Sequence, residues 1–314
     1  MGKKMRRVKK LTPSASQATE CPTRRWGPEQ RLEFIELRAF WEGGVNRGDL
    51  RDEFGVSAPQ ASADLAAYMV LAPGNLVYDL SAKRYVSSPS FAPAMTRPSA
   101  EHYLGQAASV QNGSLDQADT WIGLLPPAET VPLPARTLDP TAVRDVLAAV
   151  RNGNSVEIRY QSMNSAKPDL EWRRATPHAL ASDGLRWHLR AFCHQDGAFK
   201  DFVLGRCRGV RAPGAPGPLG DADIDWTTRV SVRLAPNPAL SPGQRAAVAW
   251  DFAMRGEHLD LPVRRALLYY LRKRLRLDVT DDAPSETPVV VVNRAAFDAA
   301  LAAARGEVSG GASA

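Results

Sequence analysis

The apolar residues at the start of the chain recur at helical spacing. Four of them stand at i, i+3, i+7 and i+8 and predict a helix with one buried face: Leu32, Ile35, Ala39 and Phe40. Pro28 suits the first turn of this helix, and Gly43-Gly44 ends it. A second, shorter helix is predicted over residues 47–54, because Asn46 is a good N-cap.

A third helix is predicted after the turn Gly55-Val56, which has the length that joins two helices in a helix-turn-helix. Ser57 is its expected N-cap, and Gln60, three residues later, is expected to complete a capping box. The predicted inward stripe consists of Ala61, Leu65 and Tyr68. The predicted outward side carries Gln60 and three small residues that let a helix approach the floor of the major groove, Ala63, Ala66 and Ala67.

A β-hairpin is predicted behind the third helix. Pro73-Gly74-Asn75 breaks the helix, and two short strands follow at residues 76–78 and 83–86. Three helices and a hairpin indicate a winged helix-turn-helix DNA-binding domain over residues 26–90. Its candidate DNA contacts, at the start of the third helix and the base of the hairpin, are Ser57, Pro59, Gln60, Ser62, Ala63, Lys83 and Arg84.

The charge of this unit leaves a second interpretation open. Residues 26–90 hold six Lys/Arg against nine Asp/Glu, whereas binding to DNA phosphates favours positive charge. A small three-helix bundle that does not bind DNA, with Gln60 fully engaged in capping, fits the same pattern. If the unit does bind DNA, its acidity indicates modest affinity per subunit, so a dimer would help.

Positive charge is concentrated at the N-terminus of the chain instead. The 314 residues carry a net charge of +6, and residues 1–25 hold eight Lys/Arg against the single Glu20. These residues lack apolar periodicity, so they predict a disordered basic tail. The tail is either a solvated arm or an arm that contacts phosphates and adds salt-dependent affinity.

The length of the chain predicts two or three domains, because 314 residues are too many for one hydrophobic core. After residue 90 the composition indicates a helical and Pro-rich connector, a β-rich unit, a linker containing APGAPGPLG, and a mixed C-terminal unit, at residues 91–140, 141–211, 212–225 and 226–305. Further helices are predicted at residues 99–111, 141–151, 241–254 and 261–274, and further strands at 230–234 and 289–292.

Several classes of protein are not indicated. No apolar run approaches the roughly 20 residues of a membrane-spanning helix, and no signal peptide is evident, so a cytoplasmic protein is expected. Cys21, Cys193 and Cys207 have no CxxC spacing and no histidine at zinc-ligand spacing, so no metal is expected. Without a nucleophile elbow, a P-loop or a paired acidic motif, neither an enzyme nor a cofactor is expected.

The β-rich unit carries a candidate site for an anion. Residues 155–211 hold ten Lys/Arg against six Asp/Glu, and alternation in one predicted strand places Arg186, His188 and Arg190 on one face. Arginine forks bind phosphate bidentately. The candidate ligand-binding residues are Tyr160, Ser162, Arg174, His178, Arg186, His188, Arg190, Arg206 and Arg208.

The alternative is a solvent-exposed face on which these arginines pair with carboxylates, for which Asp201, Glu171 and Glu157 are candidates. Trp187 and Phe202 are expected in the core and not as stacking platforms for bases. The basic residues near 264–274 either frame a ligand together with the β-rich unit or solvate an exposed helix face, and the second option is favoured.

Four segments of this unit resemble the WYL domain, a small SH3/Sm-like β-barrel of bacterial regulators: VEIRYQS, RRATPHAL, RWHLRAF and FKDFVLGR. Trp187-His188-Leu189 stands where that family has Trp-Tyr-Leu. With histidine in place of the middle tyrosine, the sequence resembles the branch of the family that regulates phage-defence operons. The runs SAPQASADL and PGNLVYDLSAKRYV are similar to that branch's winged helix-turn-helix, and residues 236–270 are similar to the C-terminal extension of WYL proteins. The resemblance covers about residues 26–280.

The resemblance implies an α+β multidomain protein: a winged helix-turn-helix, a WYL barrel and a C-terminal α/β extension. It further implies a homodimeric repressor on an inverted-repeat operator in front of a phage-defence operon, released from DNA by a nucleotide or nucleic acid at the WYL domain. Two alternatives remain: a WYL module that controls a partner enzyme instead of a promoter, and constitutive DNA binding with a purely structural barrel.

Overall fold

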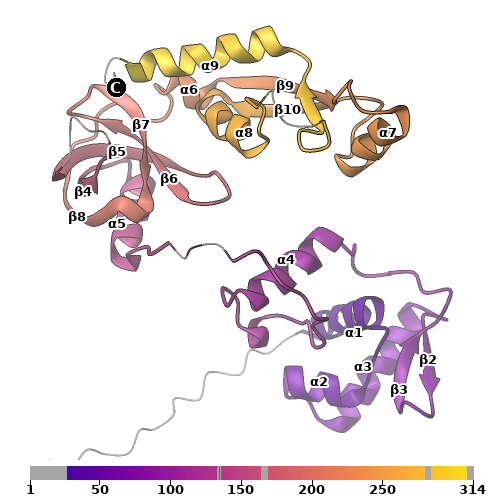
Figure 1. Ribbon diagram of the computed structural model, residues 1–314. Helices are drawn as coiled ribbons and strands as arrows, with labels where there is room; N and C mark the ends of the chain where they lie inside the picture. The colour runs from indigo at the N-terminus through magenta and orange to yellow at the C-terminus, as the bar shows by residue number, and fades with distance from the viewer. Residues whose placement is uncertain (1–26, 133, 135, 164–168, 280–283, 310–314) are drawn as a thin grey trace, which may run out of the picture. The chain divides into compact units, whose positions relative to one another are not determined.

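The computed structural model describes residues 27–132, 134, 136–163, 169–279 and 284–309, with side chains up to residue 304. It divides into two compact units, Met1–Leu133 and Pro134–Ala314, each with its own hydrophobic core (Figure 1). The basic tail predicted for residues 1–25 and Cys21 within it lie outside the described residues.

The first unit begins with three helices and a small antiparallel sheet of order β1-β3-β2. The elements are α1 (Pro28–Glu42), β1 (Gly44–Val45), α2 (Arg47–Phe54), α3 (Ala58–Leu71), β2 (Leu76–Asp79) and β3 (Arg84–Ser87). The predicted end signals act as expected: Gly43 and Gly55 adopt the left-handed conformation at the ends of α1 and α2, and the Asn46 side chain accepts from the Asp49 N–H. The winged helix-turn-helix fold is therefore confirmed.

Two details of these helices were predicted wrongly. Phe40 is 41% exposed, and Phe34 fills the core in its place, packing edge-to-face against Phe54 at 5.1 Å between ring centroids. The Ser57 hydroxyl accepts from the Gln60 N–H at 3.3 Å, but the Gln60 side chain does not return to the cap. Its amide bonds Asp64 instead, so the expected capping box is half formed. The inward stripe of α3 was predicted correctly, since Ala61, Leu65 and Tyr68 are buried.

The connector packs against this bundle instead of leaving it. Helix α4 (Ala100–Gln111), predicted from the sequence, stacks Tyr103 on Trp41 of α1 with ring centroids 4.4 Å apart. A short 3-10 helix, η1 (Gln117–Asp119), follows, and Ile122 is buried beside Tyr103. The part of the connector up to about residue 125 thus belongs to the first unit.

The second unit opens with α5 (Pro140–Asn152) and a five-stranded antiparallel sheet of order β7-β6-β5-β4-β8. The strands are β4 (Ser155–Gln161), β5 (Leu170–Ser182), β6 (Trp187–Cys193), β7 (Ala198–Val203) and β8 (Cys207–Gly214), with the 3-10 turn η2 (Leu204–Arg206) before the last. Its core is built from alternate strand residues together with Val146 of α5. Cys193 and Cys207 are free and buried in this core, and burial raises the pKa of Cys207 to about 12.

The segment expected as a linker at residues 212–225 is packed instead. Strand β8 extends to Gly214, and the Gly217 N–H donates to the Thr176 hydroxyl on β5 at 2.8 Å. Asp223 is fully buried at the start of the short helix α6 (Ile224–Thr227). Proline and glycine here shape a close-fitting turn and not a free tether.

The C-terminal part of the second unit is a three-stranded antiparallel sheet of order β10-β9-β11 with helices packed on it. Its elements are β9 (Arg229–Pro236), α7 (Pro242–Asp251), β10 (Leu259–Arg264), η3 (Arg265–Leu267), α8 (Leu268–Arg274), β11 (Val289–Val291) and α9 (Arg294–Ser309). The helix predicted from residue 261 was wrong at its start: alternating Leu259, Leu261 and Val263 and the helix-breaking Pro262 form a strand paired with β9. Within the described ranges, no helix is long and apolar enough to cross a membrane.

Candidate DNA-binding surface and ligand pocket

The first turn of α3 presents the candidate recognition surface. Ser57 and Pro59 stand at its exposed start, and Gln60, Ala63, Ala66 and Ala67 are exposed along one side. The opposite side is anchored in the core through Leu65 and Tyr68. Apart from Gln60, the first turns of this exposed side carry small side chains, and the larger Val70 is exposed only toward the end of α3, so the start of the helix can come close to another surface.

Most hydroxyl groups near this surface are engaged locally. The Ser57 hydroxyl accepts from the Gln60 N–H, and the half-buried Ser62 donates its hydroxyl to the Ala58 carbonyl at 3.0 Å. Serine hydroxyls bonded to their own helix are weak candidates for reading bases. Of the three polar candidates on α3, Gln60 keeps the most hydrogen-bonding capacity.

The two basic candidates on the wing differ in their surroundings. Lys83 lies in the turn between β2 and β3, where its backbone has a positive φ of 51°. Its side chain is exposed, so its ammonium group is accessible. Arg84 is half-buried and donates to the Gly44 carbonyl of β1, which turns its guanidinium back into the domain. Lys83 is thus better placed than Arg84 to contact a phosphate.

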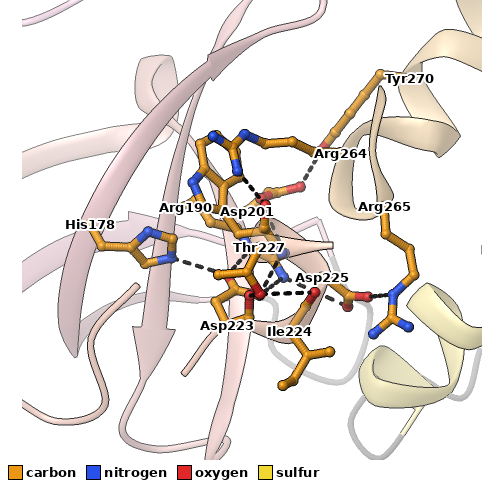
Figure 2. Close-up of polar contacts among 11 residues, drawn as sticks. His178, Arg190, Asp201, Asp223, Ile224, Asp225, Thr227, Arg264, Arg265 and Tyr270 are labelled. Atoms are coloured by element: carbon orange, nitrogen blue, oxygen red, sulfur yellow. Dashed lines mark hydrogen bonds and ion pairs between the residues drawn. The ribbon is translucent and has the colours of Figure 1, made fainter. Parts of the chain in front are cut away.

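A buried ionic network lies between the five-stranded sheet β7-β6-β5-β4-β8 and the C-terminal part of the second unit (Figure 2). Arg190 of β6, only 4% exposed, donates to both carboxylate oxygens of Asp223 at 2.7 and 3.0 Å. It also donates to Asp201 at 3.3 Å and lies 3.8 Å from Asp225. Asp225 in turn pairs with Arg265, so the network ties β6 through α6 to η3.

Histidine side chains complete this network. His178 meets Asp223 at 3.0 Å, and the buried His188 meets Asp183 at 3.0 Å. Burial alone would raise the pKa values of both aspartates, but hydrogen bonds from His178 and Arg190 to Asp223, and from His188 and two backbone N–H groups to Asp183, hold them well below the usual range. Both groups are therefore carboxylates at neutral pH.

Three further candidates are engaged or covered. Arg174 pairs with Glu157 at 3.2 Å and with the Ser155 hydroxyl at 3.1 Å. Tyr160 packs in the core against Phe202, and its hydroxyl accepts from the Val203 N–H at 3.3 Å. Ser162 is half-buried just beyond β4.

The predicted ligand residues thus separate into three groups. His178 and Arg190 share Asp223, and Tyr270 connects His188 to Asp201, which also accepts from Arg190. Alternation predicted that His188 and Arg190 lie on one face, but carboxylates from residues 183–225 already occupy this network. The pairing of arginines with Glu157 and Asp201, held open as the alternative, is present at Arg174 and Arg190.

The remaining three candidates, Arg186, Arg206 and Arg208, line one cavity of about 460 Å³, and Arg186 also donates to Asp183 at 3.1 Å. Arg136, Thr137, Leu138, Leu185, Trp187, Val203 and Gly205 complete its wall. Trp187 was expected in the core and is 48% exposed, because it begins β6 at the open end of the sheet; Phe202 is buried as predicted. A second cavity of about 330 Å³ shares Leu185 and Arg186 with the first.

Several lining residues were missed by sequence reasoning. Arg136 lies in the Pro-rich stretch before α5, and Tyr269, Lys273 and Arg274 of α8 line the second cavity. The basic cluster near 264–274 was noted but assigned to a solvated helix face. Only the fold brings it beside the turn at Leu185, since the Arg274 guanidinium donates to the Asp183 carbonyl at 3.2 Å.

Three family descriptions match the chain in sequence order. Residues 27–109 match the BrxR transcriptional regulator winged helix-turn-helix domain, residues 141–212 the WYL domain, and residues 229–297 the BrxR transcriptional regulator C-terminal dimerization domain. The DNA-binding transcriptional repressors CapW of Stenotrophomonas maltophilia and Pseudomonas aeruginosa are each 39% identical over 272 residues, covering 86% of this chain and 90% of theirs. CapW of Escherichia coli is 38% identical over the same length.

The chain belongs to the CapW/BrxR family of WYL-domain transcriptional regulators. The CapW/BrxR family is one of transcriptional repressors and not of enzymes. The three-part α+β architecture expected from the resemblance is confirmed, and its C-terminal part corresponds to a dimerization domain. Among solved structures, proteasome accessory factor B/C of Arthrobacter aurescens matches 93% of this chain and 52% of its own at 17% identity and a TM-score of 0.22, which is too low for a structural argument.

Proposed function

We propose that this protein is a homodimeric repressor that binds an inverted-repeat operator and is released from it by an anionic ligand at the WYL domain. The observation that carries the DNA-binding part is the exposed side of α3, whose first turns carry Gln60 and the small residues Ala63, Ala66 and Ala67. A helix of this kind fits the major groove, which is about 12 Å wide. The resemblance of the sequence to the WYL branch that regulates phage-defence operons supports such an operon as the controlled target.

The charge distribution supports binding as a dimer. Residues 26–90 have three more acidic than basic residues, so one subunit gains little from DNA phosphates. Arg47 and Arg51 of α2 and Lys83 of the wing are exposed and available for backbone contacts. Two copies on two half-sites double these contacts, and the basic residues at positions 3–10 add further salt-dependent affinity.

The dimer contact is proposed to include α7. Trp250 on this helix is 87% exposed, and an indole so accessible is typical of a protein interface. Trp250 lies within the residues that match the dimerization domain. Its exposed helix neighbours Gly243, Ala246 and Ala247 are small and allow close approach of a second copy.

The ligand is proposed to bind in the cavity at Arg186, Arg206 and Arg208 and not at Arg190. The cavity of about 460 Å³ is large enough for a nucleotide-sized group, and its arginines suit phosphate. The exposed ring of Trp187 supplies a surface on which a base can stack. The ligand proposed is therefore a nucleotide or a short nucleic acid.

A gel-shift experiment with the full chain tests this proposal. The DNA upstream of the gene is titrated with protein at low salt, and short single-stranded DNA or cyclic nucleotides are then added as competitors. The expected results are a shift that footprints to an inverted repeat and a release by one competitor class at concentrations that leave unrelated DNA complexes intact. Absence of any shift at low salt, or a strictly monomeric protein, would overturn the proposal.

A further inference from the structure

Three side chains form a hydrogen-bonded chain that ends on the exposed side of α3. Asp64 of α3 is 4% exposed and lies against Arg31 of α1, which is 8% exposed. Arg31 donates from Nε at 2.7 Å and from Nη2 at 3.1 Å to the two oxygens of Asp64. The third donor to Asp64 is Nε2 of Gln60, at 2.9 Å.

This contact fixes the direction of the Gln60 amide. Asp64 faces the permanently charged guanidinium of Arg31, and an ionised carboxylate only accepts hydrogen bonds. Gln60 must therefore turn its NH2 group, and not its oxygen, toward Asp64. One N–H of that group is used, so the amide retains one donor and the acceptor Oε1. The same pair is what a glutamine uses in a bidentate contact with the N7 and N6 groups of adenine.

The neighbours of Gln60 favour the same type of base pair. The hydroxyl groups of Ser57 and Ser62 are engaged with the backbone of α3. The other exposed groups on this side are apolar: the methyl groups of Ala63, Ala66 and Ala67 and, toward the end of α3, the side chain of Val70. In the major groove, the complementary apolar group is the C5-methyl of thymine.

We propose that Gln60 reads an adenine in each operator half-site, and that Asp64 and Arg31 are positioning residues that hold its amide in the orientation for adenine. This inference rests on the proposed function, because it requires α3 to enter the major groove. Thymines next to this adenine contact the alanine methyl groups of α3.

The test is a selection of bound sequences from a randomised duplex library by the full-length protein, followed by binding measurements on the selected operator. Wild-type protein is expected to select an adenine that Gln60→Ala no longer selects. Replacing this adenine by 7-deazaadenine, which lacks the N7 acceptor, or by purine, which lacks the N6 amino group, is expected to weaken wild-type binding about tenfold or more. The same replacements leave Gln60→Ala binding unchanged.

A matched variant controls for the loss of a glutamine. Gln111→Ala changes an exposed glutamine at the end of α4 in the same unit and is expected to keep the wild-type base preference. Asp64→Asn tests positioning, because an asparagine can meet either end of the Gln60 amide. This variant is expected to lose discrimination between adenine and guanine at that position by about tenfold, with a smaller change on unrelated DNA.

The outcomes separate this inference from the proposed function. If Gln60→Ala selects the same base at every position, or if the modified adenines bind wild type as well as adenine does, the assignment of Gln60 is overturned while DNA binding stands. If wild-type protein selects no sequence, the proposed function is overturned as well. Should Asp64→Asn fail to fold, Gln60→Ala and the modified bases still decide.

Discussion

The hydroxyl of Tyr68 on α3 donates a 3.0 Å hydrogen bond to the buried carboxylate of Glu36 on α1. The same carboxylate accepts from the N–H groups of Ala94, Met95 and Thr96 in the connector at 2.7, 3.0 and 2.7 Å. Burial alone would raise the pKa of Glu36, but these donors hold it below the ordinary value. One side chain thus joins α1, α3 and the connector.

Replacing Glu36 by glutamine is expected to destabilise the first unit by about 2–5 kcal/mol. The amide offers one accepting oxygen in place of two and turns an NH2 group toward buried donors, each of which costs about 1–3 kcal/mol when left unpaired. Thermal unfolding of the full chain, followed by tryptophan fluorescence, measures the loss. The exposed Glu29→Gln on the same helix is the control and is expected to change stability by less than about 0.5 kcal/mol. An unchanged unfolding temperature for the Glu36 variant would contradict this role.

In the first unit the helix ends could be predicted from the sequence, but the partners of Glu36 could not. The helix ends were predictable because Gly43, Asn46 and Gly55 act through their own backbone. A carboxylate in the middle of an apolar face gives no local signal of its partners, which lie 58 to 60 residues later in the connector. The same applies to Phe34 and Phe40: helical periodicity predicts a buried face but leaves open which of these two aromatic residues it includes.

The same limit applies in the second unit. Alternation along β6 predicted that His188 and Arg190 lie on one face, and both side chains are bonded to carboxylates. It gave no indication that Asp223, from a Pro/Gly-rich stretch, covers that network, because a contact over 33 residues leaves no periodic trace. Composition instead suggested a free linker, since it reports chain flexibility and not which side chain is buried.

The pair of Arg190 and Asp223 predicts a structural effect of mutation. Asp223→Asn or Arg190→Ala leaves one buried charge without its main partner and is expected to cost about 3–5 kcal/mol of stability in the second unit. Chemical denaturation monitored by circular dichroism measures this loss. Arg233→Ala, which removes an exposed pair with Asp260 at 2.8 Å, is the control and is expected to cost less than about 1 kcal/mol. A loss of stability for Asp223→Asn or Arg190→Ala no larger than that for Arg233→Ala would contradict the buried network.

The same pair predicts a dependence of stability on pH. The folded protein holds the pKa of Asp223 below that of an unfolded aspartate, which is about 3.9. The stabilisation is therefore complete above about pH 4 and is lost as pH falls through the lowered folded value. Unfolding free energies measured from pH 6 down to pH 2 are expected to fall more steeply for wild type than for Asp223→Asn. Parallel curves would show that Asp223 does not carry this linkage.

The proposed dimer contact predicts that Trp250→Ala weakens self-association. Truncation of a central interface tryptophan typically costs at least about 2 kcal/mol, which corresponds to a dissociation constant raised roughly thirtyfold. Sedimentation velocity over a range of concentrations measures the change. Leu219→Ala alters another exposed apolar residue of the second unit, outside residues 229–297, and is expected to leave the dimer intact. An unaltered monomer–dimer equilibrium for Trp250→Ala would exclude α7 from the contact.

Mutations at the cavity arginines Arg206 and Arg208 and at the buried Arg190 are expected to have different effects. Arg206 and Arg208 line the open cavity, and neither pairs with a carboxylate among the described residues, so replacing both by alanine is expected to preserve folding and operator binding. Release from the operator by the competitor that acts on wild type is expected to require at least about tenfold more of it, because phosphate contacts are lost. In cells this variant is a super-repressor. Arg190→Ala is expected to lower the unfolding temperature instead, because it removes a buried ion pair. If the double variant is released as readily as wild type, the cavity is not the ligand site.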